Sequence, residues 1–186
     1  MWTLAHSSPR YANQLTTSKY PNLNPMIAVD TSLLRFDLRT DPVVFASHYP
    51  NQGRDTAVAN IKGPKFIRLL SKDFPWQIDI RPMDGLPVTC LDVWRGLYES
   101  LHQPIVDSEW GFILNQNGVY DKVEAARKKR LEMDKNSLQC PLRIDYLGEM
   151  TQFRGLEKDD DYAKKRYLPG PQSPKCDENW MVKLTT

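Results

Sequence analysis

The sequence predicts an α+β domain, a mostly antiparallel sheet with about three helices packed on one face. Segments that alternate apolar and charged residues lie toward both ends of the chain, and amphipathic helical segments lie between them. This order differs from the strand–helix repeat of parallel-sheet proteins. Clean alternation also leaves one sheet face in water, which antiparallel sheets tolerate and parallel sheets rarely do.

The 186 residues suit one domain with an extension. Residues 1–32 have no apolar period and are predicted to form an N-terminal arm that docks on its own domain or on a partner. Residues 33–186 are predicted to form a single α+β domain. Three widely spaced cysteines argue against a disulfide framework. No secretory leader or membrane-length apolar run is seen, so we expect an intracellular protein, cytoplasmic or nuclear, with no membrane contact.

Strands are predicted where apolar residues recur at every second position. The clearest are "LLRFDLR" at 33–39 and "WQIDIR" at 76–81. Residues 40–64 are expected to be mainly loop with a short strand at "VVFA", and residues 157–178 are expected to be loop. The remaining predicted strands are "KFIRLL" (65–70), "LRIDYL" (142–147), "TQFRGL" (151–156) and "WMVKLTT" (180–186).

The best-defined helix begins after Thr89 and ends before Pro104. Thr89 is a good N-cap, and Asp92 stands three residues later, as in a capping box. Two further helices are expected at 106–114 and 119–135, and the second carries a basic run at 127–130 that we expect to face solvent. The predicted core consists of Trp76, Ile78, Ile80, Val93, Trp94, Leu97, Leu101, Ile144 and Trp180.

Several of these segments together resemble a family of fungal domains of unknown function, found in mushroom-forming species. The resemblance covers about residues 33–184 and is carried by "FDLR", "PWQIDIRP", "VTCLDVWRGLYESL", "PIVDSEW", "LRIDYLGEMTQFRGL" and "WMVKL". The chain departs from the family at Phe36, where the family usually has Trp. The resemblance implies an intracellular, fungal protein, and it implies no activity and no catalytic residue.

Most familiar reactive motifs are missing from the sequence. The three histidines are far apart and no ligand spacing typical of a metal site occurs, so we predict no metal site and no cofactor. No glycine-rich phosphate loop is present. Cys90 lies on the apolar face of its helix and is expected to be a buried structural residue.

Charged residues on the polar faces of the strands remain as the candidate site. If their strands are neighbours, opposite charges alternate over one face. Such a face either makes cross-strand ion pairs or binds an anionic ligand or an acidic peptide, for which arginine geometry is well suited. Arg143 and Asp145 are expected on the same kind of face. The candidate binding residues are Arg35, Asp37, Arg39, Asp79 and Arg81.

The leading functional prediction is a non-catalytic intracellular interaction module with a protein or peptide partner. The alternative is a small enzyme that uses the Asp and Arg residues of the sheet face, indicated by a deep pocket lined by two or more of them. A nucleic-acid binder is a third, disfavoured prediction. The net charge is only +2, and Phe36 and Trp76 lie in phase with the core residues instead of facing outward to stack bases.

Overall fold

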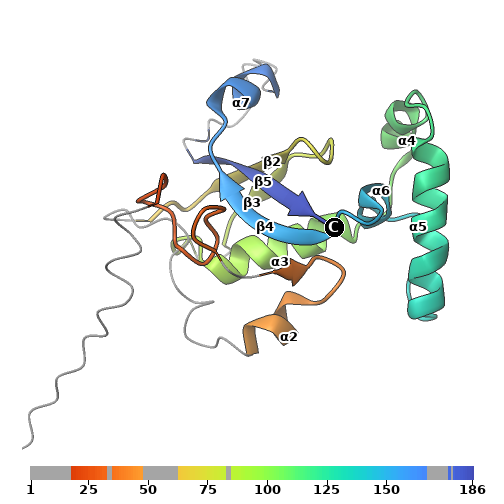
Figure 1. Cartoon of the computed structure of the whole chain (residues 1–186), viewed down its shortest axis with the longest axis horizontal. Coiled ribbons are helices and arrows are strands. Elements are labelled where there is room, and N and C mark those ends of the chain that lie inside the picture. Colours follow the sequence, from red (N-terminus) through yellow and green to blue (C-terminus); the bar gives the residue numbers. More distant parts are fainter. Residues whose placement is uncertain (1–17, 33–34, 48–62, 83–84, 167–175, 177) are drawn as a thin grey trace, which may run out of the picture.

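The computed structural model describes residues 18–32, 35–47, 63–82, 85–166, 176 and 178–186. These residues form five strands and six helices (Figure 1). The strands are β1 (Phe36–Asp37), β2 (Ile67–Ser71), β3 (Ile78–Ile80), β4 (Gln152–Glu157) and β5 (Asn179–Thr185). The helices are α2 (Pro42–Ser47), α3 (Cys90–Leu101), α4 (Asp107–Ile113), α5 (Val119–Met133), α6 (Arg143–Leu147) and α7 (Asp160–Arg166).

The five strands form one mixed sheet in the order β1-β4-β5-β2-β3. Three neighbouring pairs are antiparallel, whereas β2 and β5 are parallel. The α+β class is therefore confirmed, and the expectation of a mostly antiparallel sheet is met in part. Residue periodicity reports which face of a strand is buried but not the direction of its neighbours, so it does not reveal the parallel pair.

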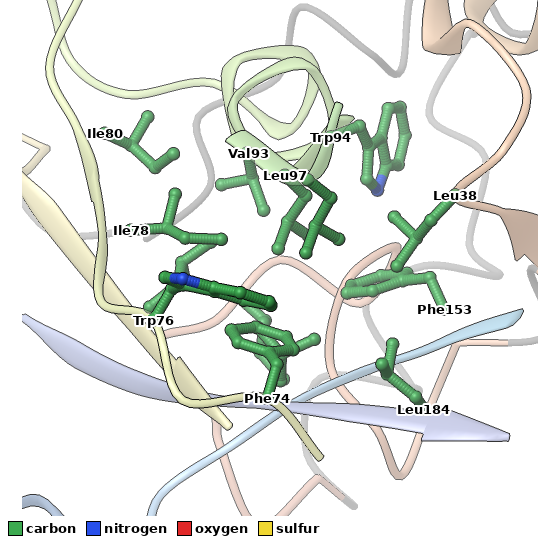
Figure 2. Close-up of a cluster of buried hydrophobic side chains, with 14 of the residues drawn as sticks. Leu38, Phe74, Trp76, Ile78, Ile80, Val93, Trp94, Leu97, Phe153 and Leu184 are labelled. Carbon is green, nitrogen blue, oxygen red and sulfur yellow. The ribbon is translucent and has the colours of Figure 1, made fainter. Parts of the chain in front are cut away.

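One face of the sheet carries the main core. Figure 2 shows Val93 and Leu97 pointing from α3 toward Ile78 and the ring of Trp76. The ring of Phe74 stacks near Trp76, with centroids 6.4 Å apart. All nine predicted core residues are buried in this single cluster, so the predicted buried faces of α3 and of the strands at β3 and β5 are confirmed. Ile144 is buried as predicted, but in α6 instead of a strand.

The opposite face of the sheet is also covered. Leu70 of β2 and Met181 of β5 are buried there with Ala163 of α7. The Tyr162 hydroxyl donates to the carbonyl of Ser71, at the end of β2, at 3.0 Å and so links α7 to the sheet. In Figure 1, α7 and α3 lie on opposite sides of the sheet. The prediction of about three helices on one face is therefore too simple, because six helices are described and α3 and α7 lie on opposite faces of the sheet.

Three segments have a different structure from the one predicted. Residues 160–166, expected to be loop, form α7. Only Ala163 of this helix is buried, so its sequence has no repeat of apolar residues from which a helix could be predicted. Residues 43–46, expected to be a strand, lie within α2. Residues 143–147 form α6 instead of a strand. Apolar and charged residues that alternate over only five positions also fit a short helix. The Asp145 carboxylate caps this helix by accepting from the Leu142 N–H at 2.8 Å.

The start of α3 is confirmed as predicted. Thr89 Oγ1 accepts from the Asp92 N–H at 3.2 Å, and the Asp92 carboxylate accepts from the Thr89 N–H at 2.9 Å. This reciprocal capping box typically stabilises a helix by about 1 kcal/mol. It fixes the start of α3, and both of its residues line a hollow between α3 and β3.

The described part of the N-terminal arm packs into the core. Leu23, Ile27 and Ala28 are fully buried. Ala28 forms a parallel bridge with Leu156 of β4, and a Cβ on Gly155 would lie 2.7 Å from the Val29 Cα. Gly155 has φ +133°, so this close approach requires a glycine. Residues 1–17 are outside the described residues, so their docking stays a prediction.

Candidate functional site

The five predicted site residues lie at opposite edges of the sheet. Arg35, Asp37 and Arg39 belong to the region of β1, and Asp79 and Arg81 belong to the region of β3. Three strands separate these two edges, which corresponds to about 19 Å for interstrand spacings of about 4.8 Å. The residues therefore do not form the single charged patch that adjacent strands would have produced.

At the β1 edge, Arg39 and Asp37 pair with each other. The Arg39 Nη2 lies 2.6 Å from Asp37 Oδ2, and its Nε lies 3.0 Å from Oδ1. Burial raises the pKa of Asp37, but the hydrogen bonds and charge of Arg39 outweigh it and bring the pKa below its ordinary value. Arg35 precedes this pair and is exposed.

At the β3 edge, Asp79 and Arg81 have different environments. Asp79 accepts a bidentate pair of hydrogen bonds from the buried Arg68, at 2.7 and 2.9 Å, and a third from Gln77 at 3.1 Å. The guanidinium of Arg81 stacks over the ring of Phe66, 3.9 Å from its centroid. Across the described chain, no carboxylate pairs with Arg81.

Asp79 and Arg81 open onto a hollow that we call the β3 groove. It has a volume of about 680 Å³ and runs between β3 and the exposed side of α3. Arg95 and Glu99 contribute charged side chains from α3. The lining residues are Asp79, Ile80, Arg81, Pro82, Leu86, Pro87, Thr89, Asp92, Arg95, Gly96 and Glu99.

The backbone of β3 has an open edge at Asp79, a residue that also lines this groove. The Arg68 N–H donates to the Glu178 carbonyl, so the peptide groups of Arg68 point toward β5 and away from β3. Its antiparallel partner Asp79 is thus in a non-hydrogen-bonded pair, with its own N–H and C=O directed away from β2. Since β3 ends the sheet, these two groups lie at an edge that no described strand covers.

Two of the residues named for the enzyme alternative therefore line one hollow. Two of the carboxylates that line this hollow, however, are already hydrogen-bonded within the protein. Asp79 accepts from Arg68, and Asp92 accepts from the N–H and the hydroxyl of Thr89. Glu99 is then the one lining carboxylate for which the described residues supply no bond. A paired acid–base arrangement needs two such groups within reach of a substrate.

The second hollow lies between α3, α5 and α6, and we call it the α3–α5–α6 cleft. Its volume is about 340 Å³. Of the predicted site residues it contains Arg39 alone, so sequence reasoning missed most of it. The lining residues are Arg39, Tyr98, His102, Ala126, Lys129, Arg130, Met133, Asp134, Ser137, Ile144, Asp145, Gly148 and Glu149.

Arg130 and Asp145 form the wall of this cleft. Arg130 donates twice to Asp145, with both distances 2.9 Å, and uses its other N–H groups on Ser137 Oγ and on the carbonyls of Leu138 and Cys140. All five donors of the guanidinium are therefore satisfied. The basic run at 127–130 is thus not simply a solvated face, and Asp145 is a buried helix residue instead of a sheet-face residue.

His102 and Tyr98 form the aromatic side of the cleft. Their rings lie 3.9 Å apart, and His102 Nδ1 lies 2.8 Å from the Tyr98 carbonyl. A carbonyl only accepts, so Nδ1 carries the proton and Nε2 is an acceptor in the neutral ring. Burial lowers the pKa of His102, and Arg130 lowers it further. The sequence could have indicated this contact, because Tyr98 and His102 are four residues apart on a predicted helix and such residues are neighbours on the helix surface.

A family of unknown function, DUF6699, has a model that matches residues 34–164. The chain belongs to the DUF6699 family. No curated protein and no solved structure matches the chain. A family of unknown function is what the sequence motifs predicted, and the match ends before the closing "WMVKL" segment.

The match contains every residue that lines either hollow of this DUF6699 protein. Within the described ranges, no cluster of three or more His, Cys, Asp or Glu residues is arranged to hold a metal ion. None of the helices described is long and apolar enough to cross a membrane.

Proposed function

We propose that this DUF6699 protein is a non-catalytic, intracellular interaction module that binds an extended peptide segment of a partner protein along β3. The observation that carries this proposal is that the Asp79 N–H and C=O point away from β2 at the open edge of the sheet, and that Asp79 also lines the β3 groove. An uncovered strand edge accepts an added strand through main-chain hydrogen bonds. The adjacent groove gives the side chains of that strand a place to lie.

Arg81 supplies the specificity in this proposal. Stacking on Phe66 holds the guanidinium plane in place but leaves its edge N–H groups available. A carboxylate of the partner, placed beside the end of β3, matches this fork with two hydrogen bonds. The proposed ligand is therefore an extended segment with an acidic residue that reaches Arg81.

The same geometry favours binding over the two alternatives. An enzyme would require reactive groups that are free to exchange protons, whereas Asp79 and Asp92 are held by bonds that support the fold. A nucleic-acid binder that used the basic run at 127–130 would require available cations there, whereas Arg127 and Arg130 bind acceptors within the protein.

The test uses peptides selected from a random-sequence display library against the whole chain. Affinities are then measured by fluorescence polarisation for wild type, Arg81→Gln and the matched control Arg39→Gln at the other sheet edge. We expect Arg81→Gln to weaken binding by roughly 1.5–3 kcal/mol, the usual value of a hydrogen bond to a charged group. Arg39→Gln should bind like wild type, and all three proteins should melt together within a few degrees.

Main-chain recognition is tested separately by methylating the backbone nitrogens of a selected peptide one at a time. An added strand points alternate N–H groups at β3, so affinity should fall at every second position within the bound segment. A peptide that tolerates methylation at every position, or that binds Arg81→Gln as tightly as wild type, would overturn the proposal.

A further inference from the structure

We propose that the α3–α5–α6 cleft is a second binding site, independent of the β3 groove, for an organic cation that carries a guanidinium or ammonium group. The inference rests on which hydrogen-bonding groups of the cleft are already occupied and which remain available. The cleft is lined by three cations and three carboxylates, so its formal charge alone indicates neither an anion nor a cation.

The cations of the cleft are all engaged by the protein. Arg130 uses its five donors as described above. Arg39 is bound to Asp37, and the Lys129 ammonium lies 2.9 Å from a Glu149 oxygen. Each cation of the cleft thus already has a carboxylate partner, and an anionic ligand would be repelled by that carboxylate, so the cleft is poorly suited to a phosphate or a carboxylate.

Acceptors, by contrast, remain available. Asp134 lines the cleft, and of the charged lining groups it is the one for which the described residues provide no ion pair. Its Oδ1 accepts the Asn136 N–H at 3.0 Å, and its Oδ2 has no donor among the described residues. His102 Nε2 is an acceptor to which no described group donates, because Nδ1 holds the proton toward Tyr98. The ring of Tyr98 adds an aromatic surface, which attracts cations through its π system.

The size and the apolar part of the cleft fit a small ligand. Its volume of about 340 Å³ lies at the lower end of the range for small-molecule sites. Met133, at 72% exposure, and the buried Ile144 supply apolar contact beside the polar groups. A short alkyl chain ending in a cationic group therefore has both apolar and acceptor surfaces to contact.

The charges around the aromatic pair also favour a cation. Burial raises the pKa of Tyr98, and the carboxylates of Asp41 and Asp134 raise it further, which places negative potential at its ring. The groups that act on His102 are Tyr98 of α3, Arg130 of α5, Asp145 of α6 and Asp41 ahead of α2. Protonating His102 removes the Nε2 acceptor and adds a positive charge, so cation binding should weaken as the solution is acidified.

The probes are butylguanidinium and its neutral isostere butylurea, titrated into the ¹⁵N-labelled chain and followed by amide chemical shifts. A second pair, acetyl-Gly-Arg-Gly-amide and its citrulline counterpart, separates a free cation from the side chain of a peptide. We expect saturable shifts at cleft residues with the cationic member of at least one pair, and none with the neutral members. Binding of butylguanidinium identifies a small free cation as sufficient, and binding of the arginine peptide alone identifies a partner's side chain.

The variants are Asp134→Asn and Glu132→Gln. Each removes one negative charge near the C-terminal end of α5, at positions two residues apart. Glu132 is exposed and does not line the cleft. We expect Asp134→Asn to weaken cation binding at least about tenfold and Glu132→Gln to leave it unchanged. His102→Gln should remove the loss of binding on acidification, because no imidazole is then left in the cleft to take up a proton. Equal binding of the neutral isosteres, no binding of either cation, or equal effects of the two carboxylate variants would overturn the inference.

Discussion

Arg130 joins three parts of the chain through one side chain. Its donors reach Asp145 of α6, Ser137, and two carbonyls of the segment after α5. The side chains of Arg130 and Asp145 are only 11% and 2% exposed. A buried, fully bonded ion pair of this kind adds little compared with apolar residues of similar size, but removing one partner leaves the other charge buried without compensation.

Replacing Arg130 by Gln should therefore be strongly destabilising. We expect the free energy of unfolding in urea to fall by roughly 3–5 kcal/mol, the usual loss when a buried pair is broken. The control is Arg127→Gln, three residues earlier on α5, where a more exposed pair with Glu124 should be worth less than about 1 kcal/mol. Equal losses in the two variants would show that Arg130 is no more than a surface residue.

His102 should make the stability of the protein depend on pH. Burial lowers its pKa in the folded chain, so as pH falls through about 6.5 the unfolded chain takes up the proton first. The contribution of neutral His102 is complete above that value and is lost as pH falls toward the folded pKa. We expect the stability difference between wild type and His102→Gln to shrink over this window, as measured by urea unfolding at a series of pH values.

An unchanged difference between wild type and His102→Gln at every pH would contradict this account. The other two histidines, His6 and His48, are outside the described residues and are present in both proteins, so their titration cancels in the comparison.

Helix α3 is the element on which both hollows depend. One side of α3, from the capping box at its start to Glu99, lines the β3 groove, and Tyr98 in its last turn and His102 at its C-cap line the α3–α5–α6 cleft. Between these ends, Gly96 allows close contact with β3, because a Cβ there would collide with Cδ1 of Ile80. The separation of α3 from β3, and with it the width of the β3 groove, depends on this contact.

Gly96→Ala should be destabilising although alanine favours a helix. The added methyl displaces Ile80, and overpacking of this kind costs typically about 1–3 kcal/mol. In an Ile80→Val background the colliding atom is gone, so the same change should stabilise the protein by about 0.5–1 kcal/mol. Urea unfolding of the four proteins in this double-mutant cycle measures the coupling. If Gly96→Ala has the same effect in both backgrounds, the helix and the strand are not in contact here.

In the whole molecule, residues distant in sequence share one core. Leu23 and Ile27 of the predicted arm lie in the same buried cluster as α3 and the strands. The Val29 N–H donates to the Leu156 carbonyl, and the Leu156 N–H donates to the Ile27 carbonyl, so this segment extends the sheet where β1 no longer pairs with β4. The sheet edge at β4 is thereby covered, whereas the edge at β3 is not covered by any described strand.

A chain that begins at residue 33 should accordingly be less stable than one that begins at residue 18. Burying a Leu or Ile side chain is worth about 1.5–3 kcal/mol, so the loss of Leu23 and Ile27 should cost roughly 3–6 kcal/mol. Thermal and urea unfolding of the two chains measure the difference. Equal stabilities would support the predicted domain boundary at residue 33, and a large difference would move it toward the N-terminus.

The sequence predicted those features that depend on local pattern. The cap at Thr89, the buried side of α3 and the alternate burial of Ile78 and Ile80 all follow from residue spacing over a few positions. Strand order does not follow from spacing, and the charged residues were therefore assigned to one patch although β1 and β3 lie at opposite edges. The α3–α5–α6 cleft was missed for the same reason, since Arg130 and Asp145 are fifteen positions apart and meet only in the fold.

The position of β5 has a consequence for biosynthesis. This strand is hydrogen-bonded to β4 on one side and to β2 on the other, so the sheet is in two parts until residues 179–185 are in place. During translation, those residues are the last of the sheet to leave the ribosome. Until then β2 and β4 have open edges, which are prone to pairing with other chains. A ribosome-bound nascent chain should therefore recruit chaperones until β5 emerges, and release them when the strand closes the sheet.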